Sequence, residues 1–118
     1  MRAISFEHKG KPSFGLLNES GVIDAGARLS GQFSDLRSIL IAGALGKLHD
    51  LHCVDADFSE EDINYLPVIP NASKILCVGI NYLGHIKETG RDIPKYPVLF
   101  TRFSDSIVGH NAPLIRPK

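Results

Sequence analysis

Apolar and polar residues alternate over the first 26 residues, which is the pattern of β-strands with one covered face. The alternating stretches are RAISFEH (2–8), SFGLLN (13–18) and VIDAG (22–26). Gly10 and Pro12 supply turn chemistry between the first two stretches, and "ESG" supplies it before the third. The pattern predicts a small antiparallel β-meander that needs a neighbour to cover its apolar face.

The apolar spacing then changes to three and four residues, which indicates short amphipathic helices. Leu36, Ile39 and Leu40 repeat in this way after Ser34, the expected N-cap, and Gly43 is the expected end of the helix. Two further short helices are predicted at ALGKLHDLH (44–52) and SEED (59–62).

A proline-bracketed connector, YLPVIPNASK, separates this region from a continuous apolar run, KILCVGI (74–80). Such a run is typical of a strand buried on both faces. We therefore predict a small α/β domain over residues 1–70 and a second domain over residues 71–118. In the second, "VLFTRF" (98–103) is a further strand and "PLIRP" (113–117) a short extended piece.

Composition narrows the function only by exclusion. The 118 residues are 43% hydrophobic and 22% charged, and 13 basic residues balance 13 acidic ones. Balanced charge gives no general attraction to nucleic acid or to an anionic membrane. With no signal peptide visible and only two cysteines, we expect a cytoplasmic protein. His49, His52 and Cys53 lie close together, but a zinc site would need a fourth ligand.

The segment CVGINYLGHIKETG (77–90) carries the candidate chemistry. Gly79 is expected to end the strand where the chain turns, Asn81 to cap a helix over residues 82–89, and Gly90 to end it. On that helix His85 and Glu88 lie at i and i+3 and share a face.

Two interpretations of this pair are open. A carboxylate beside an imidazole holds its tautomer and suits a general base, or a group that activates water. A solvated surface pair has the same spacing and is common. Arg102 is open in the same way: it could bind a substrate carboxylate, or it could lie at a strand end and face water.

The order of elements in KILCVGINYLGHIKETG and IPKYPVLFTRFSDSIVGHNAPLIRP resembles the fumarylacetoacetate hydrolase family. That family has a strand ending in V-G-x-N-Y, then H-x-x-E, P-x-x-P, an extended L-F-x-[KR], a Ser-rich turn with V-G, and a final Pro. The match covers residues 74–117. Residues 1–70 resemble the smaller N-terminal domain of many bacterial members.

The resemblance implies an α+β fold in which the meander and short helices precede the first strands and lid helix of a mainly-β roll. It implies an enzyme that uses Mg²⁺ or Mn²⁺ and acts on a small 2-oxo or β-diketo acid. Relatives cleave C–C bonds of acylpyruvates or fumarylacetoacetate, and others decarboxylate, hydrate or isomerise such acids. The residue roles implied are His85 as the base that activates water, Glu88 as its partner, Asn81 and Tyr82 as substrate-binding residues, and Gly79 as the turn at the site. For Arg102 the resemblance implies substrate binding or a role in bracing the site.

One part of the family pattern is missing. The family's metal ligands are two glutamates one residue apart, in a motif like D-Y-E-x-E-L, and a later aspartate. Glu60 and Glu61 are adjacent and precede the strand, so they cannot be that pair. We therefore expect the N-terminal part of a longer, homodimeric enzyme, without activity or a tight metal site of its own and prone to associate through open strand edges. The alternative is a non-catalytic module for dimerisation or partner binding.

Overall fold

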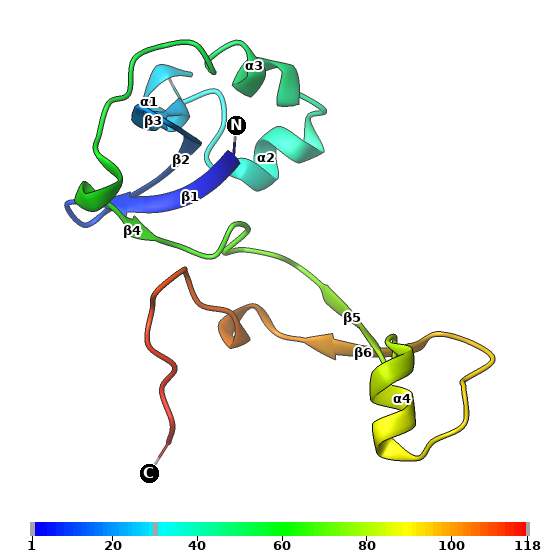
Figure 1. The fold of residues 1–118 in the computed structure, drawn as a ribbon. Coiled ribbons are helices and arrows are strands. Elements are labelled where there is room, and N and C mark those ends of the chain that lie inside the picture. Colours follow the sequence, from blue (N-terminus) through cyan, green and yellow to red (C-terminus); the bar gives the residue numbers. More distant parts are fainter. Residues whose placement is uncertain (1, 30, 118) are drawn as a thin grey trace. The chain divides into compact units, whose positions relative to one another are not determined.

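A computed structural model describes residues 2–29 and 31–117 and divides the chain into two compact units (Figure 1). The first unit comprises Met1–Asn71 together with Ile107–Lys118, and the second comprises Ala72–Ser106. The chain passes from the first unit to the second between Asn71 and Ala72, next to the boundary predicted near residue 70. The grouping of residues 107–118 with the first unit differs from the predicted division, and the assignment of residues 71–118 to a catalytic domain stays a prediction.

The first unit is built on a four-stranded antiparallel sheet with the order β3-β2-β1-β4. Its strands are β1 (Arg2–His8), β2 (Lys11–Asn18), β3 (Gly21–Asp24) and β4 (Asn64–Tyr65). Lys9 and Gly10 both have positive φ, 50° and 76°, as the two-residue turn between β1 and β2 requires. The predicted meander over the first three strands is confirmed.

The described residues of the first unit also form the short helices α1 (Ala25–Arg28), α2 (Leu36–Ile41) and α3 (Leu45–His49) and the 3₁₀ turn η1 (Glu60–Asp62). The predicted cap of α2 was wrong by one residue. Asp35 is the N-cap, because its Oδ1 accepts a hydrogen bond from Ser38 N at 2.7 Å. The hydroxyl of Ser34 instead donates to Asp35 Oδ2.

The third strand is also shorter than predicted, because the chain becomes helical at Ala25. Asp24 caps α1, and its Oδ1 accepts from Ala27 N at 3.0 Å. A carboxylate at the end of a strand is a good N-cap, so the strand pattern and the cap compete for the same residues.

Apolar residues are buried on both faces of the first sheet. Neighbouring side chains of β2 point to opposite faces, and Leu16 and Leu17 belong to different buried clusters. One cluster packs against α2 and α3 and contains Phe14, Leu16, Ile23, Ala25, Leu36, Ile39 and Leu48. The other contains Ile4, Phe6, Leu17, Val22 and Ile63. The meander therefore finds the covering neighbour that its pattern requires.

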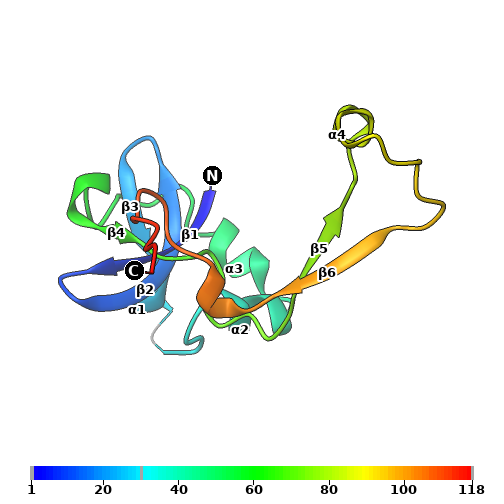
Figure 2. The ribbon, with the colours of Figure 1, turned by 90° about the horizontal axis from the view of Figure 1, so that it is seen from below.

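The second unit is a two-stranded antiparallel hairpin with a helix in its connection. Its elements are β5 (Ile75–Gly79), α4 (Leu83–Thr89), β6 (Val98–Arg102) and the 3₁₀ turn η2 (Ser104–Ser106). Figures 1 and 2 both show α4 at the end of the hairpin where β5 finishes and β6 begins.

The prediction that the apolar run of β5 is buried on both faces was wrong. Leu76 is 65% exposed and Val78 51%, and the opposing Leu99 of β6 is 61% exposed. Two paired strands bury little surface by themselves, and neither face of this hairpin is covered by a further layer within the second unit.

Residues 107–117 form no regular strand. In the short extended piece predicted over residues 113–117, Leu114 and Ile115 are exposed. Gly109 lies against the backbone of β4 so closely that a Cβ there would come within 1.8 Å of Tyr65 O. Every helix within residues 2–29 and 31–117 is too short or too polar to span a bilayer.

Candidate active site

The turn between β5 and α4 contains an unusual backbone conformation. Ile80 has a φ of 52°, whereas Gly79 before it is not in the left-handed region. Positive φ is rare for a β-branched residue and costs on the order of 1–3 kcal/mol. The sequence predicts the turn at Gly79 and not at Ile80, because glycine adopts positive φ far more readily than isoleucine.

The helix α4 starts one residue later than predicted. Tyr82 is its N-cap and makes no side-chain capping hydrogen bond, so the expected cap Asn81 does not serve as one. Its C-cap, Gly90, has a φ of 63°, which confirms the predicted end of the helix. Ile86 is the buried residue of α4 and anchors it.

His85 and Glu88 lie on one face of α4, as their spacing predicts. His85 Nδ1 is 3.7 Å from Glu88 Oε2, and the two side chains are 58% and 80% exposed. This separation is longer than a hydrogen bond, and an exposed pair contributes little to stability. The geometry leaves both groups accessible to a solute, and it fits a solvated surface pair equally well.

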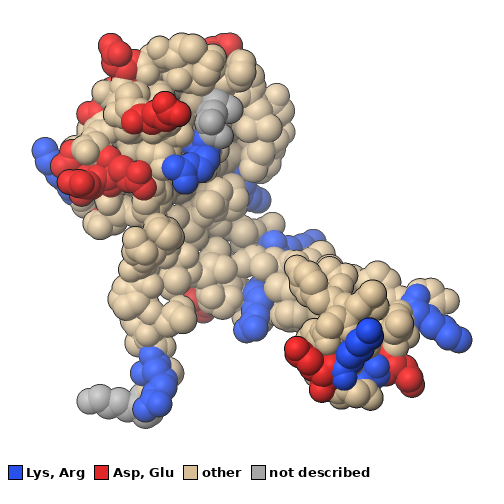
Figure 3. All heavy atoms as spheres, viewed as in Figure 1, with Lys and Arg blue, Asp and Glu red and all other residues tan. Residues whose placement is uncertain are grey.

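Charged side chains of both signs surround this pair. Figure 3 shows red and blue atoms side by side around α4. The sequence there supplies Lys87 and Glu88, then Arg91 and Asp92. The two signs offset one another, so α4 by itself offers no strong attraction for an anionic substrate.

A pocket of about 290 Å³ lies beside the β5–α4 turn. Asn81 and Gly79 line it together with Lys95 from the loop that leads to β6. An amide and an ammonium group are suited to a carboxylate or a carbonyl oxygen. The remaining lining residues are Val78, Ile80, Leu83, Ile86, Ile93, Pro94, Tyr96, Pro97 and Val98.

The other predicted substrate residues lie elsewhere. Tyr82 is 77% exposed and does not line the pocket. Arg102 pairs with Ile75, at the opposite end of the hairpin from the Gly79–Val98 pair. Four residues of strand separate the two ends by about 13 Å. Arg102 instead has its guanidinium carbon 5.6 Å from the ring centroid of Phe100.

The described residues do not form a metal site. No group of three or more His, Cys, Asp or Glu side chains within residues 2–29 and 31–117 is placed to hold a metal ion. His85 and Glu88 alone would supply two ligands. The residues present therefore do not fit the Mg²⁺ or Mn²⁺ that the family resemblance implies.

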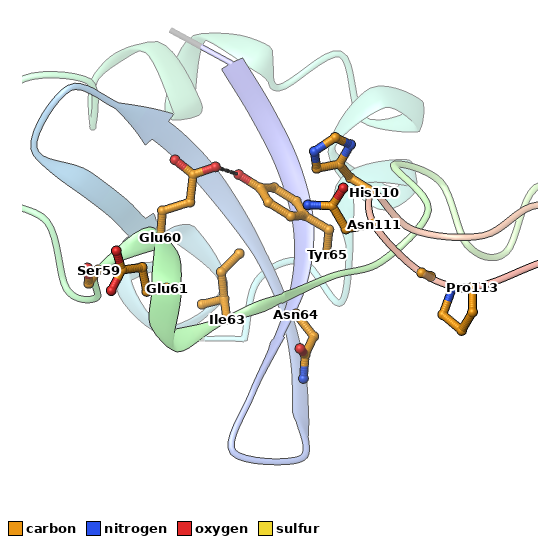
Figure 4. A pocket seen from close by; sticks show the side chains of 10 residues that line it. Ser59, Glu60, Glu61, Ile63, Asn64, Tyr65, His110, Asn111 and Pro113 are labelled. Atoms are coloured by element: carbon orange, nitrogen blue, oxygen red, sulfur yellow. Dashed lines mark hydrogen bonds between the residues drawn. The ribbon is translucent and has the colours of Figure 1, made fainter.

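The first unit has a larger hollow, of about 790 Å³, between η1, β4 and residues 110–113 (Figure 4). Tyr65 Oη donates to Glu60 Oε1 at 2.5 Å, and the ring of His110 stands edge-on to Tyr65. Burial, and after it the hydrogen bond to Glu60, raises the pKa of Tyr65 to about 12. None of the predicted site residues lines this hollow.

Comparison with known proteins gives the following relatives. No family model matches the chain. It is 31% identical over its whole length to "Oxaloacetate tautomerase fahd2, mitochondrial" of Xenopus laevis, of which it covers 39%. It is 30% identical over 87% of its length to "Fumarylacetoacetate hydrolase domain-containing protein 2 homolog" of Dictyostelium discoideum, of which it covers 35%.

Among solved structures, a Mycobacterium smegmatis protein assigned as HpcE matches 98% of this chain with a TM-score of 0.77. The identity is 23%, so this match concerns the fold, and it covers 41% of that protein. The chain thus spans about two fifths of the length of each of these three proteins.

Proposed function

Because this chain belongs to the fumarylacetoacetate hydrolase family, we propose that it is the N-terminal part of an enzyme acting on a small 2-oxo acid. The observation that carries the proposal is the alignment of all its residues with an oxaloacetate tautomerase at 31% identity. The mixed α+β fold with antiparallel sheets, shared with the HpcE structure, supports it. In this proposal β5, α4 and β6 are the first strands and lid helix of a larger, mainly-β roll.

The reaction we favour is the keto–enol interconversion of oxaloacetate, since the Xenopus laevis relative is named for that activity. It requires a base to remove a proton from C3 and a proton to reach the oxygen on C2. C–C bond hydrolysis of an acylpyruvate and decarboxylation of oxaloacetate are the alternatives. In hydrolysis the same base would take its proton from water.

In this mechanism His85 is the base and Glu88 orients its imidazole. Their i,i+3 position on one face of α4 supports the pairing, and their exposure leaves both groups accessible to a solute. The 3.7 Å between Nδ1 and Oε2 would have to shorten for Glu88 to accept a hydrogen bond from the imidazole. A general base typically contributes about 10²–10⁴-fold to a rate.

The substrate residues divide between two places. Asn81 lines the pocket beside the turn, where we propose that its amide and the neighbouring Lys95 bind a carboxylate of the oxo acid. Tyr82 is proposed to contact substrate from the start of α4. For Arg102, at the far end of the hairpin, we propose a role in bracing β6 through its contact with Phe100.

The family relation implies a divalent metal in the whole enzyme, Mg²⁺ or Mn²⁺. The described residues do not supply its ligands, so the steps proposed for His85 and Glu88 are proton transfers only. Reading the coding sequence beyond codon 118 tests this point directly. A continuation with a D-x-E-x-E motif supports the proposal, and a stop codon at that place contradicts it.

The enzymatic test uses the protein translated from the complete reading frame. Ketonisation of enol oxaloacetate is followed by ultraviolet absorbance with added Mg²⁺ or Mn²⁺, and pyruvate is measured as the product of the two alternative reactions. His85→Ala should lower the tautomerase rate by about 10²-fold or more. Lys87→Ala, on the same helix and likewise exposed, is the matched control and should leave the rate within about twofold.

Two outcomes would change the assignment. Unaltered activity in His85→Ala would remove His85 from the mechanism. Loss of Mn²⁺ binding in His85→Ala, measured by calorimetric titration, would make His85 a metal ligand instead of a base.

A non-catalytic module is the second candidate. It is favoured by the two buried clusters of the first unit, which give residues 2–29 and 31–71 a core of their own. Partner capture by this unit without any turnover in the complete protein would support it. A cytoplasmic location and a homodimeric assembly stay predictions.

A further inference from the structure

Ile80 holds a left-handed conformation in the turn that joins β5 to α4. The turn consists of Ile80, Asn81 and Tyr82, and the φ of Ile80 is 52°. Among the residues that the structure describes, the other non-glycine residues with positive φ are Lys9 and Asn111, and neither is β-branched. Left-handed backbone is an outlier for a β-branched residue, so the surroundings of Ile80 have to sustain it.

The neighbouring glycine does not take the strained position. Gly79 is not in the left-handed region. A Cβ at Gly79 would meet side-chain carbons of Phe100 at 3.5 Å and of Val98 at 3.7 Å, which is ordinary van der Waals contact. Neither crowding nor φ therefore requires glycine at residue 79. The chain turns at residue 80 instead, where the energetic cost is carried by an isoleucine.

The side chain of Ile80 has surroundings that can sustain this cost. Ile80 is half-buried and lines the pocket of about 290 Å³ beside the turn. The lining also contains Ile86, which is 5% exposed and anchors α4, and Val98, the first residue of β6. Relaxing the φ of Ile80 would move its side chain out of this apolar lining and into water, which is unfavourable. The lining therefore holds the turn.

The position of Asn81 depends on this turn. Asn81 lines the same pocket and does not cap α4, since the N-cap is Tyr82. The helix therefore leaves the amide of Asn81 free for a ligand and does not orient it. Because the peptide bond is planar, the backbone angles of Ile80 set the direction in which the chain leaves β5 for Asn81.

We propose that Ile80 is a positioning residue, which directs the amide of Asn81 toward a carboxylate of the oxo acid in this pocket. The side chain of Ile80 has no polar atom, so it neither binds the carboxylate nor transfers a proton. It restricts the orientations of Asn81 before the substrate arrives. A preorganised donor binds more tightly, because less freedom is lost on binding. The inference rests on the proposed function, in which Asn81 binds substrate.

The test uses the protein translated from the complete reading frame and malonate as the probe, a small dicarboxylate without a 2-oxo group. Calorimetric titration measures the Kd of malonate. Ile80→Gly frees the turn and should raise this Kd by about tenfold. Ile80→Ala keeps the backbone cost, removes the side chain that sustains it, and should also raise the Kd. Ile80→Val is the conservative variant, β-branched and one methylene smaller, and should restore the Kd to within about twofold of the parent value.

A double-mutant cycle separates positioning from a merely structural role. Asn81→Ala should itself raise the Kd. Adding Ile80→Gly to Asn81→Ala should change it by no more than about twofold further, because the amide to be positioned is gone. In oxaloacetate ketonisation, Ile80→Gly should raise KM and leave kcat within about twofold, because the base His85 is intact. Far-UV circular dichroism checks the fold of each variant, and Ile80→Ala replaces Ile80→Gly in the cycle if the spectrum of the latter changes.

The outcomes distinguish this inference from the proposed function. A Kd for folded Ile80→Gly within twofold of the parent value overturns the inference, and so do additive effects of Ile80→Gly and Asn81→Ala. Absence of malonate binding by the parent protein removes the carboxylate site from this pocket and overturns it as well. A parent protein that binds malonate but does not ketonise oxaloacetate contradicts the proposed reaction instead, and the Kd values still decide the role of Ile80.

Discussion

Replacing Gly15 with alanine should strongly destabilise the first unit. Gly15 lies in the middle of β2, between its partners Ile4 of β1 and Asp24 of β3. A Cβ at this position would lie 1.8 Å from the carbonyl oxygen of Ile23 and 3.0 Å from the amide nitrogen of Ala25. Both obstacles are backbone atoms, which cannot rotate away as a side chain can.

The magnitude follows from that geometry. Overpacking a core typically costs about 1–3 kcal/mol, and a clash with two backbone groups of the neighbouring segment belongs at the upper end, about 3 kcal/mol. For a small protein the free energy of unfolding falls by about 1–3 kcal/mol for each molar of urea. With a slope of about 1.5 kcal/mol per molar, the unfolding midpoint of Gly15→Ala should fall by about 2 M.

Gly46→Ala is the matched control, because it adds the same methyl group to the same unit. Gly46 lies in α3, and nothing is within 4 Å of the position of its Cβ. Alanine in a helix is favoured over glycine, so this variant should gain about 0.5–1 kcal/mol. Urea unfolding followed by far-UV circular dichroism measures both. A midpoint for Gly15→Ala equal to or above that of the parent chain would refute the reasoning.

Three further predictions concern the caps, the phenol and the hairpin. Asp35→Ala removes the α2 cap and should cost about 1 kcal/mol at pH 7. The hydrogen bond from Ser38 N lowers the pKa of Asp35. Its stabilisation is therefore present above about pH 4 and lost as pH falls through the lower folded value, so parent and variant should converge in acid urea melts. Glu60→Gln should lower the pKa of Tyr65 from about 12, though burial keeps part of the shift, and NMR titration of labelled tyrosine measures it. The protonated phenol of Tyr65 contributes its full stabilisation below about pH 10, the pKa of an unfolded tyrosine. That contribution is lost as pH rises through the raised pKa of the folded chain. Leu99→Lys should reduce self-association in sedimentation, because Leu99, Val78 and Leu76 form one exposed apolar face of the hairpin. Equal sedimentation of parent and variant would count against that face as the cause.

The local elements could be predicted because their causes are local. The strand alternation around Ile4 and Phe6 and the helix end at Gly90 depend on residues within a few positions of one another. The predicted N-caps Ser34 and Asn81 each lie one residue before the observed N-caps, Asp35 and Tyr82. In each case the neighbouring residue was free to take the cap position, and the cap depends on backbone angles that the sequence does not encode residue by residue.

The burial of β5 could not be predicted because it depends on what covers the strand. The continuous apolar run of residues 74–80 is typical of a strand covered on both faces. Within the second unit the pairing partner is β6 alone, and Leu76 and Val78 stay exposed. The sequence pattern therefore predicts a covering layer that the second unit does not itself contain.

The position of Arg102 shows what strand order adds to a motif. Gly79 and Val98 face each other because the chain leaves β5 and returns through α4 to begin β6 at the same end. In an antiparallel pair, each further residue along β6 lies opposite an earlier residue of β5. Arg102, the fourth residue after Val98, must therefore lie about 13 Å from the turn that carries Asn81. Once β5 and β6 are taken to pair antiparallel, the spacing of L-F-x-[KR] by itself predicts that Arg102 lies at the far end of the hairpin from the turn. A residue that follows the active-site helix closely in a motif can still be directed to the other end of the hairpin.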